Sequence, residues 1–214
     1  MLNPKAYLLD FDGPVCDLFP SGGTTTIAAD TRAPLLSAGV ELPEELTESV
    51  QHLRVLRYAG QHAAPAVLEA VEQAAIAGEI EAARHAPITP GVREFLEGCA
   101  AAGKPVVVVS NNAAVAIDGF LEREELAHLV VAVLGRPYAR PELMKPDPYR
   151  AIEAFRLLGY GAEDCCMVGD EPTDTLFARA AGVPSIAYAK SPQHEERLRE
   201  VRPDVVVRSM VGLV

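Results

Sequence analysis

Six short runs of apolar residues recur along the chain and constrain its fold more than any other feature of the sequence. Apart from Ser185 and Asp204, the runs are apolar throughout, as expected for strands that are covered on both faces. The runs are 6–9, 105–109, 129–134, 165–168, 184–188 and 204–207. Helical patterns over 91–102, 148–158 and 173–181 each stop at a glycine, which suits a left-handed helix end. This alternation predicts an α/β fold in three layers, a parallel sheet with helices on both faces.

Residues 18–86 break this rhythm, because they contain no convincing strand and are rich in Ala, Glu and Leu. An acidic start and an apolar stripe predict one helix from 43 toward 60, and a second helix is predicted over 65–77. The chain is therefore predicted to fold as an α/β core domain, 1–17 and 87–214, with a small helical domain, 18–86, inserted after the first strand.

The charge balance narrows the classes of partner. Among 214 residues, 30 are acidic and 19 basic, a net charge of −11 that argues against nucleic acid and anionic membranes as partners. The four cysteines show no zinc-type spacing and are expected as reduced, buried thiols. No leader-like or membrane-spanning stretch is found, so we expect a cytoplasmic protein, either a monomer or a homodimer.

Two aspartates, Asp10 and Asp12, follow the first apolar run and stand directly before Gly13. Residues two apart in a strand point the same way, so both carboxylates are predicted on one face at the carboxyl end of the sheet. Like charges that close repel each other, and the pair is tolerable if a cation lies between them or if one keeps a proton. Acidic turn residues that merely follow a strand are the alternative interpretation.

Two further segments carry polar residues that suit an anion. Ser110 and Asn111 follow a run of valines, and a small hydroxyl with backbone amides at a strand-to-helix turn can cradle an anion. Lys145 stands among prolines before a predicted helix, a rigid setting for a lysine that points inward at a charged group. The alternatives are an ordinary turn at Ser110-Asn111 and a solvated lysine.

The fourth apolar run is followed by three carboxylates within five residues, Asp170, Glu171 and Asp174. Such a cluster suits a hard divalent cation, which prefers oxygen ligands. Capping of the following helix by Asp170 or Asp174 would explain the same residues.

The four sets, in chain order, are Asp10-Phe11-Asp12-Gly13, Ser110-Asn111, Lys145-Pro146-Asp147-Pro148 and Gly169-Asp170-Glu171-Pro172-Thr173-Asp174. In this order they resemble the four motifs of the haloacid dehalogenase-like (HAD) superfamily, from residue 6 to about residue 190. The helical insertion is similar to the family's small α-helical cap of the first type, C1. The resemblance implies a Rossmann-like core and a place in the phosphatase or beta-phosphoglucomutase branch.

By this resemblance, Asp10 is the nucleophile that attacks phosphorus and forms an aspartyl-phosphate. Asp12 is the general acid and base, and its presence favours phosphoryl transfer because the dehalogenating members lack a carboxylate there. Ser110 and the backbone amide of Asn111 hold the transferring phosphoryl oxygens, and Lys145 neutralises charge between nucleophile and phosphate.

The resemblance also implies a Mg²⁺ cofactor. The Asp10 side chain, the Asp12 carbonyl and Asp170 are its expected ligands. Asp174 matches the second acidic position of the fourth motif, where it is expected to orient Lys145 or a metal-bound water.

Two positions depart from the family pattern. Pro14 stands where phosphatases commonly carry Thr, which removes a hydroxyl and a backbone donor and puts the orientation of Asp12 in question. Glu171 stands where Ser is more usual, and we expect it to cap a helix rather than to reach the metal through water.

Substrate choice is expected from the cap, since the fold alone does not determine it. Arg54 and Arg57, one helical turn apart with His52 nearby, are candidates to recognise a substrate carboxylate or second phosphate; solvation of a helix face is the alternative. The segment Ser21-Gly22-Gly23 and the threonines after it would suit a hinge at which the cap opens.

The leading prediction is a Mg²⁺-dependent phosphatase that acts on a small phosphorylated metabolite. A sugar-phosphate mutase of the beta-phosphoglucomutase type shares the motifs and the cap. Phosphonate hydrolysis is disfavoured, because that branch uses a cap lysine and residues 18–86 contain none. A phosphate-binding regulatory protein with impaired chemistry is the third alternative, motivated by Pro14.

Overall fold

A computed structural model describes residues 2–20 and 24–214 of the chain. Within them, six strands form one parallel sheet, as predicted, and their order in the sheet is β3-β2-β1-β4-β5-β6. The strands are β1 (Ala6–Leu9), β2 (Val106–Val109), β3 (Ala132–Leu134), β4 (Cys165–Gly169), β5 (Ser185–Tyr188) and β6 (Val205–Val207). Each lies within or within one residue of its predicted run, and β3 is shorter because a 3₁₀ turn takes up Ala127–Leu129.

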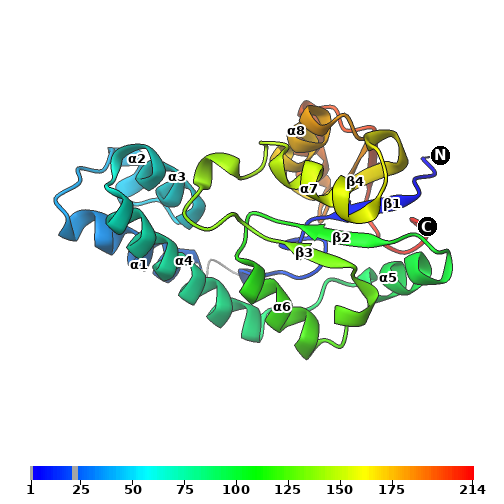
Figure 1. The fold of residues 1–214 in the computed structure, drawn as a ribbon, viewed down its shortest axis with the longest axis horizontal. Helices are drawn as coiled ribbons and strands as arrows, with labels where there is room; N and C mark the ends of the chain where they lie inside the picture. Colours follow the sequence, from blue (N-terminus) through cyan, green and yellow to red (C-terminus); the bar gives the residue numbers. More distant parts are fainter. Residues whose placement is uncertain (1, 21–23) are drawn as a thin grey trace.

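Helices cover both faces of the sheet (Figure 1). They are α5 (Val92–Ala101), α6 (Ala114–Arg123), α7 (Tyr149–Leu158), α8 (Pro172–Ala181) and α9 (Pro192–Glu200), with 3₁₀ turns η2 (Ala127–Leu129), η3 (Pro141–Leu143) and η4 (Ala162–Asp164). Strand β1 shows why its sequence is apolar throughout: Tyr7 and Leu9 pack in the core under α5 and α6, whereas Leu8 packs under α7 and α8. A strand buried on both faces cannot alternate with polar residues.

Among the described residues between β1 and α5, four helices lie apart from the sheet, at the opposite end of the molecule from both termini (Figure 1). They are α1 (Thr24–Ser37), α2 (Glu44–Thr47), α3 (His52–His62) and α4 (Pro65–His85). Their shared core also includes Met144, which is buried and precedes Lys145 in a loop of the α/β core. The long helix α4 also packs along α6 and so connects the insertion to the sheet layers.

One prediction in this region is wrong. The helix predicted from residue 43 toward residue 60 is broken into α2 and α3, and Val50 of its apolar stripe is 47% exposed. Arg32 of α1 explains the break, because its guanidinium donates to the backbone carbonyls of Leu46 and Ser49. A long-range donor thus satisfies carbonyls that a continuous helix would have used. The proposed hinge at 21–23 lies outside the described residues.

Two simpler predictions hold. Gly103, Gly159 and Gly182, at the predicted helix ends, have φ angles of 66°, 68° and 73°. The four cysteines are buried and unpaired. Among the described helices, none is both long and apolar enough to cross a membrane.

Candidate active site

The carboxyl ends of β1 and β4 meet at the centre of the sheet, where the strand order reverses. Ligands of parallel sheets bind at such a switch point. A cavity of about 280 Å³ lies there, between the strand ends and α3. The predicted site residues that line it are Asp10, Asp12, Ser110, Asn111, Lys145, Arg54 and Arg57. The structure therefore brings together the residues that sequence reasoning selected from segments far apart in the chain.

Lys145 is the centre of the polar contacts at the floor of the cavity. Its Nζ lies 2.7 Å from Asp10 Oδ1, 2.6 Å from Asp174 Oδ1 and 3.1 Å from the carbonyl oxygen of Val109. The residue is only 3% exposed, which rules out the solvated lysine. Burial lowers the lysine pKa, but the charges of Asp10 and Asp174 outweigh it and raise the pKa of Lys145. The ammonium therefore stays charged.

Asp170 is the residue whose surroundings point most directly to a cation. Its Oδ2 forms an ion pair with Lys190 Nζ at 2.9 Å, whereas its buried Oδ1 has no hydrogen-bond partner among residues 2–20 and 24–214. Burial raises the pKa of Asp170 well above its usual range. Carboxylate oxygens of Asp10, Asp170 and Asp174 all lie within 4.8 Å of one another. This donor set, with one unmatched buried oxygen, fits a hard divalent cation.

Asp12 is held by the turn that follows β1. Its Oδ1 accepts a hydrogen bond of 2.9 Å from the backbone amide of Leu18, and burial raises its pKa to about 6. The hydroxyl of Thr89, from the segment before α5, donates to the carbonyl of Gly13 at 2.6 Å. The turn around Pro14 is thus fixed by a hydroxyl from elsewhere in the chain.

The 110–112 loop, Ser110 to Asn112, is organised by side chains as well as by backbone. The side-chain oxygen of Asn112 accepts from the Ser110 hydroxyl at 3.1 Å, and the backbone amide of Asn112 donates to Ser110 Oγ at 3.2 Å. The Asn111 side chain accepts from the Lys145 amide at 2.7 Å and donates to the Lys145 carbonyl at 3.2 Å. Asn111 therefore clamps the backbone of the lysine, a contact that sequence reasoning did not anticipate.

The acidic residues at the beginning of α8 cap this helix. Glu171 is the N-cap, and its side chain accepts from the backbone of Asp174, while Asp174 Oδ2 accepts from the Glu171 amide at 2.9 Å. This reciprocal capping box leaves Asp174 Oδ1 for Lys145. Glu171 additionally pairs with Arg197 at 2.7 Å, at the surface.

Residues of α3 face the strand ends across the cavity. Arg57 donates to the carbonyl of Lys145, and its burial lowers the pKa of its guanidinium. Arg54 lines the cavity, and within the described parts of the chain no carboxylate pairs with it. His52 also lines it but is directed to Glu79, 2.9 Å away, and is 3% exposed. Arg54 is therefore a guanidinium of α3 that lines the cavity without a carboxylate partner among the described residues.

Sequence reasoning missed Lys190 and Thr89. Lys190 follows the end of β5, so the rule that selected the other strand ends would have found it. Thr89 lies in a connecting segment with no local pattern, and its role is visible only through its contact with Gly13.

Comparison with known proteins gives one family. The haloacid dehalogenase-like hydrolases match residues 4–182. A phosphoglycolate phosphatase of Rhodospirillum rubrum is 31% identical over 205 residues, which cover 88% of this chain and 83% of that protein. A predicted phosphoglycolate phosphatase from Haemophilus somnus superposes with a TM-score of 0.69 at 20% identity, covering 98% and 96% of the two chains.

A phosphonoacetaldehyde hydrolase-like protein of Oleispira antarctica superposes as well, with a TM-score of 0.70 at 15% identity, over 100% of this chain and 94% of that one. At such identities the structural likeness shows the fold, which proteins of different names share. The chemistry has to be argued from the residues of the site.

Proposed function

Since this chain belongs to the haloacid dehalogenase-like hydrolases, we propose that it is a Mg²⁺-dependent phosphatase of a small phosphorylated metabolite. The observation that carries the proposal is Lys145, buried between Asp10 and Asp174 at the floor of the cavity. A fixed ammonium beside a carboxylate nucleophile lowers the repulsion that a phosphate dianion would otherwise meet. The relative named phosphoglycolate phosphatase supports this substrate class.

The proposed reaction has two displacements at phosphorus. The Asp10 carboxylate attacks phosphorus, the bond to the ester oxygen breaks, and Asp12 gives its proton to the leaving oxygen. Asp12 then takes a proton from the water that attacks the resulting aspartyl-phosphate, which frees Asp10 and inorganic phosphate. A pKa of about 6, raised by burial, allows Asp12 to hold and release a proton near neutral pH.

In this proposal the 110–112 loop receives the phosphoryl oxygens through Ser110 Oγ and the Asn111 amide. Asp10, Asp170 and the Asp12 carbonyl would hold Mg²⁺, which when bound neutralises charge on the phosphoryl group. Asp174 positions Lys145, and the capping box in turn fixes Asp174. Residues 18–86 act as the cap, in which Arg54 recognises the part of the substrate remote from the phosphate.

The size of the cavity supports a small substrate. About 280 Å³ suits a phosphorylated two- to four-carbon acid or a sugar phosphate, and it is small beside the usual range of ligand pockets. Arg54 and Arg57 supply positive charge on the cap side, in a chain whose net charge is −11. An anionic substrate such as a phosphorylated carboxylic acid would be complementary to these groups.

The test is release of inorganic phosphate from phosphoglycolate, sugar phosphates, nucleotides and a phosphopeptide, with Mg²⁺ or with EDTA. We expect turnover of a small phosphomonoester with Mg²⁺, none with EDTA, and none by Asp10→Asn. The proposal is refuted if none of these compounds is hydrolysed, or if Asp10→Asn keeps full activity. A requirement for a sugar bisphosphate activator with little phosphate release would instead identify a mutase.

Arg54→Ala tests the cap assignment. We expect a raised KM for an anionic substrate with a smaller change in kcat, and an unchanged KM would contradict recognition by Arg54. The arginine of the exposed Arg84–Glu81 pair on α4 offers a matched control, Arg84→Ala, which should leave both constants as they are.

A further inference from the structure

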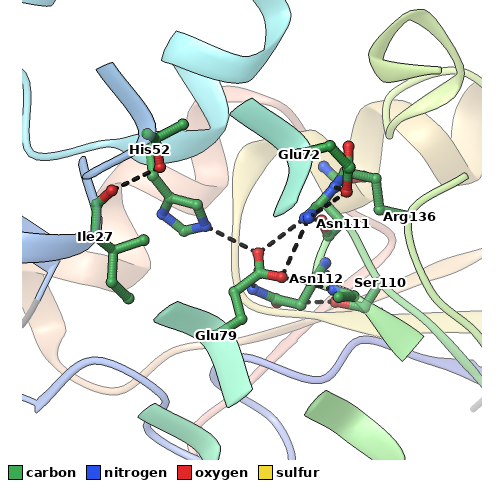
Figure 2. A network of polar contacts seen from close by, with 10 residues as sticks. Ile27, His52, Glu72, Glu79, Ser110, Asn111, Asn112 and Arg136 are labelled. Atoms are coloured by element: carbon green, nitrogen blue, oxygen red, sulfur yellow. Dashed lines mark hydrogen bonds and ion pairs between the residues drawn. The ribbon is translucent and has the colours of Figure 1, made fainter. Parts of the chain in front are cut away.

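A buried network of charged side chains joins the cap to the α/β core (Figure 2). Arg136, from the loop after β3, pairs with Glu72 and Glu79, both of α4, at 2.7 Å and 2.8 Å. His52 of α3 lies 2.9 Å from Glu79. All four side chains are at most 4% exposed. Burying charged side chains costs desolvation free energy, so we expect a buried network of this size to have a role beyond keeping the protein soluble.

Arg136 is tied to the 110–112 loop as well as to the cap. Its backbone amide donates to the carbonyl of Asn112 at 2.8 Å, and its guanidinium donates to the carbonyl of Asn111 at 2.7 Å. One residue thus holds both the loop and the two carboxylates of α4.

The two glutamates differ in what they contact. Glu72 uses one oxygen, Oε1, for Arg136, and its Oε2 has no partner in the described part of the structure. Glu79 bonds Arg136 and also accepts from the Ala113 amide at 2.9 Å and from the Asn112 side chain at 3.3 Å. Figure 2 shows the Glu79 carboxylate between His52 on one side and Arg136 with Asn112 on the other.

The end of the loop has no cap of its own. Ala113 is the N-cap residue of α6 and supplies no side-chain hydrogen bond. The Glu79 carboxylate takes that place from another helix, where a negative charge is favoured by the helix dipole. Because Asn112 in turn accepts from the Ser110 hydroxyl, the contact reaches a residue that lines the cavity.

We propose that Glu79 is a positioning residue of the active site, which holds the 110–112 loop in its phosphate-binding shape from the cap side. Glu79 acts through Asn112 and Ala113 and does not itself touch the substrate. The proposal rests on the proposed function, in which Ser110 and Asn111 bind phosphoryl oxygens. It makes substrate binding depend on a cap helix outside the four motifs.

The pair Glu79→Gln and Glu72→Gln separates positioning from stabilisation. Both replace a charged partner of Arg136 by a neutral amide with one acceptor oxygen, but only the first also takes a charged acceptor away from the Asn112 side chain and the Ala113 amide. We would measure thermal unfolding, KM and kcat, and the calorimetric Kd of inorganic phosphate in the presence of Mg²⁺. Glu81→Gln, an exposed glutamate of the same helix, is the control.

Both buried variants should lose thermal stability. Glu79→Gln should raise KM and the Kd of phosphate by about tenfold, the equivalent of one lost hydrogen bond to a charged group. Glu72→Gln should leave the Kd of phosphate within about twofold of the parent value, as an effect on stability alone requires. Equal shifts in the two variants, or none in Glu79→Gln, would overturn the proposal.

If Glu79→Gln does not fold, Glu79→Asp keeps the charge beside Arg136 but withdraws the carboxylate from Ala113, and it should raise the same Kd. Phosphate calorimetry needs no turnover, so it remains decisive even if the wild-type protein hydrolyses none of the tested esters. If the wild type hydrolyses substrate and the Glu79 variants bind phosphate as tightly as the wild type does, only the positioning role of Glu79 is refuted. Absence of phosphate binding by the wild type removes both.

Discussion

The site contains several carboxylates, and its two lysines, Lys145 and Lys190, pair with different ones. Lys145 lies between Asp10 and Asp174, whereas Lys190 reaches Asp170 from the end of β5. Lys190 is 41% exposed at its side chain, so unlike Lys145 it has room to move away. Its ammonium holds an oxygen of the residue that we expect to bind Mg²⁺. The Lys190 ammonium and Mg²⁺ would therefore compete for the carboxylate of Asp170.

Replacing this lysine should strengthen metal binding. Lys190→Met removes a positive charge 2.9 Å from Asp170, so we expect the calorimetric Kd of Mg²⁺ to fall several-fold, by about three- to tenfold for a partly exposed pair. Lys5→Met, which breaks a Lys–Asp pair with Asp164 away from the site, is the matched control. Weaker Mg²⁺ binding by Lys190→Met would show that the lysine supports the metal site instead.

The helices of cap and core contact each other closely at some points and not at others. In α3, a Cβ at Gly60 would overlap the buried ring of Pro141, which begins η3 of the α/β core. In α6, Gly119 is exposed, and a Cβ there would meet nothing within 4 Å. One glycine permits the approach of cap to core, while the other only weakens its helix.

The two glycines should therefore respond to alanine with opposite signs. Gly119→Ala should raise the free energy of unfolding by about 0.5–1 kcal/mol, through helix propensity alone. Gly60→Ala should lower it by about 1–3 kcal/mol, because the proline ring cannot turn aside. Chemical denaturation of both variants checks the signs. Stabilisation by Gly60→Ala would mean that α3 does not rest against Pro141 in solution.

At the scale of the molecule, cap and core are joined by buried charges as well as by apolar packing. Glu79 takes part in several of these contacts, since it touches His52 of α3, Asn112 of the 110–112 loop and Arg136. Burial opposes its ionisation, but Arg136 and His52 outweigh this and hold the pKa of Glu79 at about 2. The charged form of the carboxylate is thus a property of the folded state.

This arrangement predicts acid sensitivity with a definite sign. Below pH 4.5 the unfolded chain takes up a proton on Glu79 that the folded chain refuses down to about pH 2, so unfolding is favoured as pH falls. The shift corresponds to up to about 3 kcal/mol of stability, present above pH 4.5 and lost toward pH 2.

Urea denaturation between pH 5 and pH 3 measures the effect. The free energy of unfolding of the wild type should fall more steeply over this range than that of Glu79→Gln, because the glutamine has no proton to bind. Glu81→Gln should keep the wild-type slope, since Glu81 is exposed. Parallel slopes for wild type and Glu79→Gln would place the acid sensitivity in other carboxylates.

Local pattern was sufficient for the strands of the sheet and the helix ends at glycine, whereas Asp10, Ser110, Lys145 and Asp170 were selected together, through the resemblance of the four motifs in their order along the chain. Strands buried on both faces must be apolar throughout, and polar groups that follow them collect at one edge of a parallel sheet. Both rules depend on residues that are close together in the chain, so they can be applied to the sequence alone. The interruption between α2 and α3 could not be predicted in this way, because the guanidinium that donates to the Ser49 carbonyl belongs to Arg32 of another helix.

The apolar runs and the four motifs predict the α/β architecture, the family and most of the residues that surround Asp10. The ion pairs depend instead on tertiary packing: Lys145 with Asp174, Lys190 with Asp170, and Glu79 with Arg136. Periodicity reports whether a side chain is buried, but a buried charge takes its partner from whatever segment the packing brings within about 3 Å. That choice is made between elements up to tens of residues apart, where local pattern carries no information.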